Sequence, residues 1–185
     1  MADGSLARRY ARAMISLADE TGQTDLFAQQ MAAFLEVVQQ DGGLLGSVLG
    51  NPGLTTIERR AVLDRVLERL SLHVHVGSFL KLLVDKNRFA HLAEILPAYL
   101  GMADEQANRA RATVTTARPL DAAMAARVKA SLEASTGRSV ILTQAVDPRV
   151  IGGMVVRLGD TIYDSSIRAR LASVEAALLR SAAQA

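Results

Sequence analysis

Three histidines are the side chains of this sequence best suited to bind a transition metal. His73 and His75 are two residues apart, so on a helix their side chains point in different directions. His91 follows a predicted turn, and no glutamate or cysteine partner stands at zinc-site spacing. The chain has no cysteine, which excludes disulfides and thiol catalysis. We therefore expect histidines at the surface or boundary of the fold, and no metal site.

Two glycine-rich stretches, residues 42–47 and 50–53, have the composition of phosphate-binding loops. A Walker loop requires a strand before its first glycine and a lysine directly after its last glycine. No lysine follows either stretch, and the flanking segments have helical periodicity. Both stretches are therefore predicted to be loops between helices, and we expect no cofactor.

Nucleophilic catalysis has no candidate residues in this sequence. No serine lies in the G-x-S-x-G pattern that exposes a nucleophile at a tight turn. Asp160 and Asp164 form a close carboxylate pair, but a turn and a helix cap account for both side chains. Without a positioned base and nucleophile, the sequence predicts a protein with no catalytic residues and no small-molecule substrate.

Basic residues are concentrated in the C-terminal part of the chain. Residues 1–110 hold 11 lysines and arginines against 13 acidic residues, whereas residues 111–185 hold 10 against 6. The alternative function is therefore a nucleic-acid-binding regulator that uses this basic C-terminal domain. Such a site needs a denser basic stripe or stacking aromatics, and Tyr163 is the only aromatic residue after Arg111. We expect no nucleic-acid partner, and a solvated face or a protein contact at Arg149, Arg157, Arg168 and Arg170.

The elements that position these side chains fall into two parts. Over residues 1–108, apolar residues recur at helical spacing in six segments separated by turns, which predicts a six-helix antiparallel bundle. Over residues 109–185 the period changes to the alternation of strands, with turn residues between short apolar runs. The predicted order there is β-α-β-β-β-α, a small α/β domain. The predicted fold class of the whole chain is α+β.

Nothing in the sequence predicts insertion into a membrane. No run of about 18 consecutive apolar residues occurs anywhere in the chain. The first residues lack the apolar core of a secretory signal. Half of the residues are hydrophobic but only 4% are aromatic, so the predicted cores are aliphatic.

The first and fifth predicted helices have broader apolar surfaces than one buried stripe requires. On the first helix, Ala7, Ala11 and Ala18 extend the stripe formed by Leu6, Tyr10, Ala13, Met14 and Leu17. An amphipathic helix normally buries its apolar face in its own fold. A helix with so broad an apolar surface can also hold an amphipathic helix of a partner.

The segment from Asp147 to Leu171 has the most distinctive pattern. Asp147 and Pro148 favour a turn, and Gly152-Gly153 permits a bulge or a close backbone approach. Residues 154–156 and 161–163 favour strands joined by a tight turn, and Asp164 to Ser166 suit a helix N-cap. A segment this ordered, with no reactive groups, predicts binding rather than catalysis.

This segment resembles the C-terminal signature of the delta subunit of the F-type ATP synthase, the oligomycin-sensitivity-conferring protein family. Residues 6–14 and 79–89 are similar to the family's first helix and to its mid-chain helix and turn, in the family's order. Ser165 departs from the pattern, because the family usually has glycine there. The matching residues are Gly152, Gly153, Val155, Val156, Arg157, Gly159, Asp160, Asp164, Ser166, Arg168 and Leu171.

The resemblance implies a non-catalytic stator subunit of a proton-translocating, bacterial ATP synthase, at the cytoplasmic face of the inner membrane. It implies that the helical domain binds N-terminal helices of the alpha subunits, while the C-terminal domain holds the b-type subunits of the peripheral stalk. The implied alpha-binding residues lie on the first and fifth helices: Tyr10, Ala11, Met14, Leu17, Val76, Phe79, Leu80 and Leu83. The implied stalk-binding residues lie on the last helix: Ile167, Leu171, Val174 and Leu178.

Overall fold

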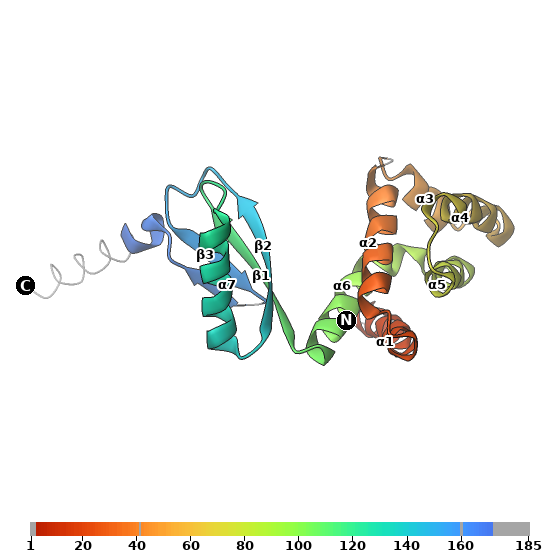
Figure 1. Ribbon diagram of the computed structural model, residues 1–185. Helices are drawn as coiled ribbons and strands as arrows, with labels where there is room; N and C mark the ends of the chain where they lie inside the picture. Colours follow the sequence, from red (N-terminus) through yellow and green to blue (C-terminus); the bar gives the residue numbers. More distant parts are fainter. Residues whose placement is uncertain (1–2, 41, 160, 172–185) are drawn as a thin grey trace, which may run out of the picture. The chain divides into compact units, whose positions relative to one another are not determined.

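The computed structural model describes residues 3–40, 42–159 and 161–171 (Figure 1). The chain divides into two compact units, Met1–Ala103 and Asp104–Ala185. Six α-helices come first along the chain, and a four-stranded sheet with its helices follows. The predicted α+β fold is therefore confirmed. The predicted domain boundary after residue 108 stays a prediction.

The first unit is built from helices of unequal length, with one 3-10 turn, η1, before the last of them (Figure 1). Pro97 lies inside the sixth helix. The sixth helix also continues past the end of the first unit. The bounds are α1 Asp3–Thr21, α2 Thr24–Gln40, α3 Leu44–Gly50, α4 Thr56–Leu70, α5 Val74–Asp85, η1 Phe89–His91 and α6 Leu92–Gln106.

Side-chain caps fix the starts of α4 and α5. Thr55 and Glu58 form a capping box, in which the Thr55 hydroxyl accepts a hydrogen bond from the Glu58 amide and Glu58 Oε2 accepts one from the Thr55 amide. Its hydrogen bonds with Thr55 hold the pKa of Glu58 below its ordinary value. At α5, His73 Nδ1 accepts a hydrogen bond from the His75 amide at 3.3 Å. The pair of histidines therefore serves to start a helix.

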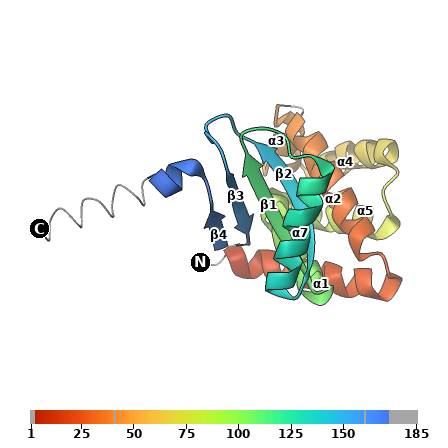
Figure 2. The same ribbon diagram turned by 60° about the vertical axis from the view of Figure 1, so that its left-hand side comes forward.

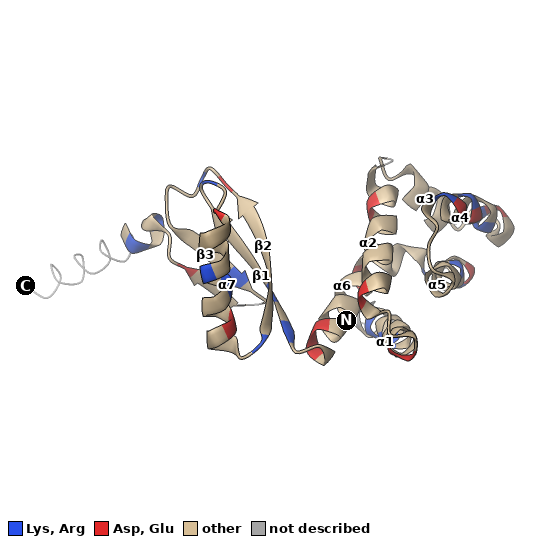
Figure 3. Cartoon of the chain, in the orientation of Figure 1, with Lys and Arg blue, Asp and Glu red and all other residues tan. Residues whose placement is uncertain are grey.

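Opposite charges on α4 and α5 pair across the two helices. Arg60 lies 2.9 Å from Asp85, and Lys81 lies 2.6 Å from Asp64. Figure 3 shows the alternating basic and acidic residues of α4. These pairs are partly exposed, so they orient the helices more than they stabilise them.

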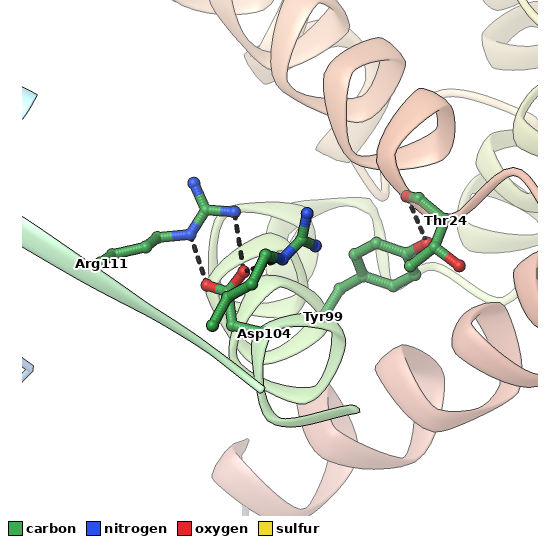
Figure 4. Close-up of polar contacts among 5 residues, drawn as sticks. Thr24, Tyr99, Asp104 and Arg111 are labelled. Atoms are coloured by element: carbon green, nitrogen blue, oxygen red, sulfur yellow. Dashed lines mark hydrogen bonds and ion pairs between the residues drawn. The ribbon is translucent and has the colours of Figure 1, made fainter. Parts of the chain in front are cut away.

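Tyr99 of α6 is the largest fully buried side chain of the helical unit. Its hydroxyl donates a hydrogen bond of 2.9 Å to the backbone oxygen of Thr24 at the start of α2 (Figure 4). Burial raises the pKa of Tyr99 to about 12, and the negative charges of Asp19 and Asp25 act in the same direction. The phenol therefore holds two helices together only in its neutral form.

We expect the helical unit to lose stability at alkaline pH because of Tyr99. The folded pKa lies above the unfolded value, so the stabilisation is complete below pH 10 and is lost as the pH rises through 12. A shift of two pKa units corresponds to at most about 3 kcal/mol. Urea unfolding as a function of pH should show this loss, and Tyr99→Phe should remove it. An identical alkaline loss in Tyr99→Phe would contradict the prediction.

The second unit contains a four-stranded mixed sheet in the order β2-β1-β3-β4 (Figure 2). β1 and β2 are parallel and are joined through α7, whereas β1 with β3 and β3 with β4 are antiparallel. Asp121 caps α7 by accepting a hydrogen bond from the Met124 amide, and Gly137 ends the helix in the left-handed conformation. The bounds are β1 Arg109–Thr116, α7 Ala122–Thr136, β2 Ser139–Val146, β3 Met154–Leu158 and β4 Thr161–Asp164.

The alternating sequence of β1 separates a covered face of the sheet from an exposed face. Ala112, Val114 and Thr116 are buried on the covered face, whereas Arg111 and Thr113 are exposed on the other. α7 packs on the covered face through Val128. The buried apolar core that the described residues of this unit form is small and is made by Ala112, Val114, Val128, Val140 and Val156.

An ion-pair cluster holds the start of β1. Both oxygens of Asp104 accept hydrogen bonds from Arg111, at 2.5 and 3.1 Å (Figure 4). Arg109 Nε lies 3.5 Å from Asp104 Oδ1. Because Asp104 is only 7% exposed, the carboxylate is shielded from water and its pairing with arginine offsets the cost of burial.

Candidate binding site

The described residues contain no group of three or more side chains that could hold a metal ion. His73 and His75 instead stack near Phe27, with the two imidazole rings 5.1 Å apart. Within the same described part of the chain, no helix is both long and apolar enough to cross a bilayer.

The predicted residues of α1 divide between the core and a half-buried stripe. Ala11 and Met14 are buried, at 0% and 3% exposure, and belong to the core of the helical unit. Tyr10 and Leu17 are only partly buried and pack against the edge of that core. Sequence reasoning treated these positions as one group, whereas the structure places them on two adjacent sides of the helix.

The predicted residues of α5 are all buried. Val76, Leu80 and Leu83 are fully enclosed, and Phe79 is 6% exposed. Leu82, which was not among the predicted residues, is 42% exposed on the same helix. Leu82 lies three residues after Phe79, so the two side chains are neighbours on the helix surface.

Tyr10 and Phe79 bring α1 and α5 into contact. Their ring centroids are 6.3 Å apart, and the rings meet edge to face at 65°. Leu6, Tyr10, Ala13 and Leu17 follow one another at spacings of three and four along α1, and none of them is fully buried. Together with two residues of α5 they form an apolar strip, here called the α1–α5 surface: Leu6, Tyr10, Ala13, Leu17, Phe79 and Leu82.

The sequence contains a signal for Leu6, Ala13 and Leu82, the residues of the α1–α5 surface that were not among the predicted binding residues. Leu6 extends the stripe of Tyr10 and Leu17 by one helical turn, and Ala13 lies between these two residues on the same stripe. Leu82 falls outside the narrow stripe that α5 buries. Helical spacing alone, however, cannot decide which of two apolar stripes faces the core of its own unit.

The structure describes two of the four predicted stalk-binding residues. Ile167 and Leu171 are 45% and 62% exposed, whereas Val174 and Leu178 lie outside the described residues. The helix that carries Ile167 is capped by Ser166, whose hydroxyl accepts a hydrogen bond from the Ala169 amide. The Ser166 amide in turn donates to Asp164, and this hydrogen bond holds the pKa of Asp164 below its ordinary value.

The glycine pair explains the signature between Asp147 and Leu171. Gly153 has a φ of +79°, and a Cβ atom there would lie 2.5 Å from the Ser165 backbone oxygen. A Cβ atom on Gly152 would lie 2.6 Å from a methyl carbon of Ile167. The predicted close backbone approach is therefore confirmed. It brings the segment after β4 against the segment before β3.

Ser165 fits this turn, where the family resemblance led us to expect glycine. Among the described residues, the non-glycine positions with positive φ are Ser71, Asn87 and Asn108, so Ser165 carries no such strain. Its amide and its hydroxyl both donate hydrogen bonds of 3.0 Å to the Met154 backbone oxygen. The serine hydroxyl therefore adds a second hydrogen bond to the one that the backbone amide of a glycine would also make. Asp160, the other turn residue of the signature, lies outside the described part of the chain.

Three of the four C-terminal arginines named above have different surroundings in the structure. Arg149 is paired with Asp147 at 2.8 Å, and hydrogen bonds from its side chain hold the pKa of Asp147 below its ordinary value. Arg157 alternates with the buried Val156, so it lies on the exposed face of the sheet. Arg170 lines a hollow on the covered face. Tyr163 is the one aromatic side chain among the described residues of the second unit, and a single ring offers no row of stacking platforms, which weakens the nucleic-acid alternative.

Comparison with known proteins gives consistent matches over nearly the whole chain. The profile of the family described as ATP synthase delta (OSCP) subunit matches residues 6–178. The ATP synthase subunit delta of Geotalea uraniireducens is 35% identical over 95% of this chain and 97% of its own length. That of Myxococcus xanthus is 39% identical over 92% of this chain and 94% of its own length.

A solved structure shares the fold. A chain in the cryo-EM structure of the Toxoplasma gondii mitochondrial ATP synthase hexamer aligns with a TM-score of 0.69 at 22% identity. The alignment covers 94% of this chain and 97% of that chain. At this identity the match supports the fold alone.

A helical unit that keeps part of its apolar surface exposed, followed by a small α/β unit, is suited to binding another protein. The chain belongs to the ATP synthase delta (OSCP) subunit family. It is a non-catalytic stator subunit that links the catalytic head to the peripheral stalk, and so serves proton-coupled ATP synthesis.

Proposed function

We propose that the helical unit binds the apolar face of an N-terminal helix of an alpha subunit, and that the C-terminal part of the chain holds the b-type stalk subunits. The complex would lie at the cytoplasmic face of a bacterial inner membrane. The alpha helix would contact α1 and α5 through or above Tyr10, Ala11, Met14, Leu17, Val76, Phe79, Leu80 and Leu83. The stalk would contact the last helix at Ile167, Leu171, Val174 and Leu178.

The observation that carries the alpha-subunit proposal is the half-buried stripe of α1 beside the exposed Leu82 of α5. Tyr10 and Leu17 lie next to buried neighbours but keep part of their apolar surface in water. Leu82 is 42% exposed, and Phe79 beneath it contacts Tyr10. A helix laid along this surface would remove that apolar area from water. The buried residues Ala11, Met14, Val76, Leu80 and Leu83 would then support the surface from below.

The mechanical role of a stator subunit favours apolar contacts that dissociate slowly. Rotation of the central shaft pulls on the catalytic head, so the link to the stalk must resist torque for many turnovers. Apolar burial contributes about 25 cal/mol per Å² before the costs of association. Tight, well-packed contacts lengthen the lifetime of a complex mainly by slowing its dissociation. A stator needs that slow dissociation more than it needs rapid association.

Leu82→Asp is the sharpest test of the α1–α5 surface. A carboxylate there would have to be desolvated beneath a bound helix, so we expect the affinity for a synthetic alpha N-terminal helix to fall at least about tenfold. The matched control is Leu26→Asp on α2, because Leu26 is 38% exposed and lies outside this surface. In the reconstituted synthase, Leu82→Asp should abolish proton-driven ATP synthesis while the head still hydrolyses ATP.

The outcome also separates the two candidate functions. Apolar binding of the peptide should persist at high salt, whereas nucleic-acid binding through the basic C-terminal part would weaken steeply. If Leu82→Asp and Leu26→Asp bind the peptide as tightly as the unaltered chain, the assignment to α1 and α5 is wrong. A salt-sensitive complex of the chain with nucleic acid, without peptide binding, would favour the regulator instead.

A further inference from the structure

Two adjoining hollows lie beside α7 on the covered face of the sheet. Their volumes are about 370 and 360 Å³, and both are lined by Met124, Met154 and Ser165. The first extends to Leu120 and Ile167, and the second extends to residues of the α7 face and to Tyr163. In Figure 2, α7 lies in front of β1 and β2, while β3 and β4 lie to its left. We call the two hollows together the α7 cleft.

The α7 cleft exposes apolar side chains that the small core of this unit does not absorb. Met124 is 42% exposed, Tyr163 is 53% exposed and Ile167 is 45% exposed. The register of the sheet pairs Tyr163 with Val156, so its ring lies on the face that α7 covers in part. Methionine side chains adapt their shape to a partner, and two of them line both hollows.

The rim of the α7 cleft is basic. Arg127 lines one hollow and Arg170 the other, and the residues described around them include no carboxylate. The nearby acidic side chains are already used, since Asp121 caps α7, Asp164 accepts from Ser166 and Glu133 accepts from the Val140 amide. Figure 3 shows basic residues on α7 and on the helical turn after β4. Neither Arg127 nor Arg170 has a carboxylate partner among residues 104–159 and 161–171.

We infer that the α7 cleft binds an amphipathic helix of a stalk subunit whose apolar stripe is flanked by carboxylates. The stripe would cover Met124, Met154 and Tyr163, and the carboxylates would pair with Arg127 and Arg170. The inference rests on the proposed stalk contact and gives it a surface. That surface differs from the last-helix contact, because it includes α7 and β3 as well as Ile167.

The test uses the full chain with ε-¹³C-labelled methionine. The sequence has six methionines, of which Met124 and Met154 line the cleft while Met14 and Met31 lie in the helical core. The probe is a synthetic helix of about 18 residues with a leucine stripe flanked by glutamates, long enough to be helical. Its twin carries lysines in place of the glutamates. We expect the glutamate peptide to shift the signals of Met124 and Met154 and to leave those of Met14 and Met31 unchanged.

Charge reversal tests the basic rim. Arg127→Glu should weaken binding of the glutamate peptide about tenfold and strengthen binding of the lysine peptide. Arg138→Glu is the matched control, because Arg138 is exposed and lines neither hollow, and it should change neither affinity. Equal binding of both peptides to the unaltered chain, or equal effects of the two reversals, would overturn the inference.

Deleting residues 172–185 tests whether this segment of the same chain, instead of a stalk helix, occupies the α7 cleft. If residues 172–185 of the same chain fill the cleft, deleting them should itself shift Met124 and Met154, and the full chain should not bind the peptide there. That result overturns the inference. Capture of the b-type subunits by a Met124→Asp variant with unchanged affinity would also overturn it, while leaving the proposed stalk function intact. Failure of the unaltered chain to capture these subunits would refute the proposed function itself.

Discussion

Replacing Phe79 with alanine is expected to lower the free energy of unfolding of the helical unit by about 3–5 kcal/mol. Phe79 is 6% exposed in the core, and its ring meets Tyr10 edge to face across the contact of α1 with α5. The substitution removes the ring, leaves a cavity between two helices and deprives Tyr10 of its partner. Urea unfolding, followed through the methyl signals of the buried Met14 and Met31, reports on this unit alone.

Leu82→Ala is the control for this prediction. Leu82 lies on the same helix but is 42% exposed, so its truncation should cost less than about 1 kcal/mol in the isolated chain. When the affinity of folded protein for the alpha peptide is measured, Leu82→Ala should lose more than Phe79→Ala. Leu82 contributes to the binding surface, whereas Phe79 mainly supports it. A cost below about 1 kcal/mol for Phe79→Ala would mean that the contact with Tyr10 does not form in solution.

The helices were predictable because local signals in the sequence agree with one another. Thr55 and Glu58 form the capping box that their spacing suggests, and Gly137 ends α7 where the apolar period stops. Pro97 did not break α6, since tertiary packing of Ile95 and Tyr99 on either side holds the helix in the core. The alternation in the sequence likewise predicted a strand here, and the burial of the β1 side chains alternates as expected of a strand with one covered face.

The order of the strands was not predictable from these signals. β3 follows β2 in the chain but pairs with β1, and β2 lies at an edge of the sheet. Alternation fixes the face of each side chain but carries no information about which strand lies beside which. The α7 cleft depends on that order, because it brings Met124, Met154 and Tyr163 together from three separate elements. Sequence reasoning therefore missed it.

The alpha-binding residues were predicted at the level of helices but not of individual side chains. Of the positions named on α1 and α5, Tyr10 and Leu17 keep exposed surface, while Ala11, Val76 and Leu80 are fully buried. A periodic apolar pattern is the same whether a helix buries it in its own unit or in a partner. Only the packing of the folded helical unit, which buries Ala11 and Met14 but leaves Tyr10 and Leu17 partly exposed, separates the two stripes.

Replacing Gly153 with alanine is expected to lower the free energy of unfolding of the α/β unit by about 3 kcal/mol or more. Two costs add at this position. The backbone has a φ of +79°, which disfavours any residue with a Cβ atom, and that atom would lie 2.5 Å from the Ser165 oxygen and 2.9 Å from the Ser166 Cα. Both contacts are with backbone, so neither can be relieved by a side-chain rotation. The segment after β4 must move away from β3 instead.

Gly159→Ala separates these two costs. Gly159 also has a positive φ, +56°, but a Cβ atom there would meet no atom within 4 Å. Its replacement should therefore cost only the conformational penalty of about 1–2 kcal/mol. The loss of stability can be read in urea from the methyl signal of Met154, whose backbone oxygen accepts both hydrogen bonds of Ser165. Equal losses in the two variants would mean that the close approach of Ser165 to Gly153 does not contribute to the fold. A larger loss in Gly153→Ala would show that position 153 needs glycine because the Ser165 backbone approaches it closely. Position 165 itself accommodates serine, because its φ lies outside the left-handed region.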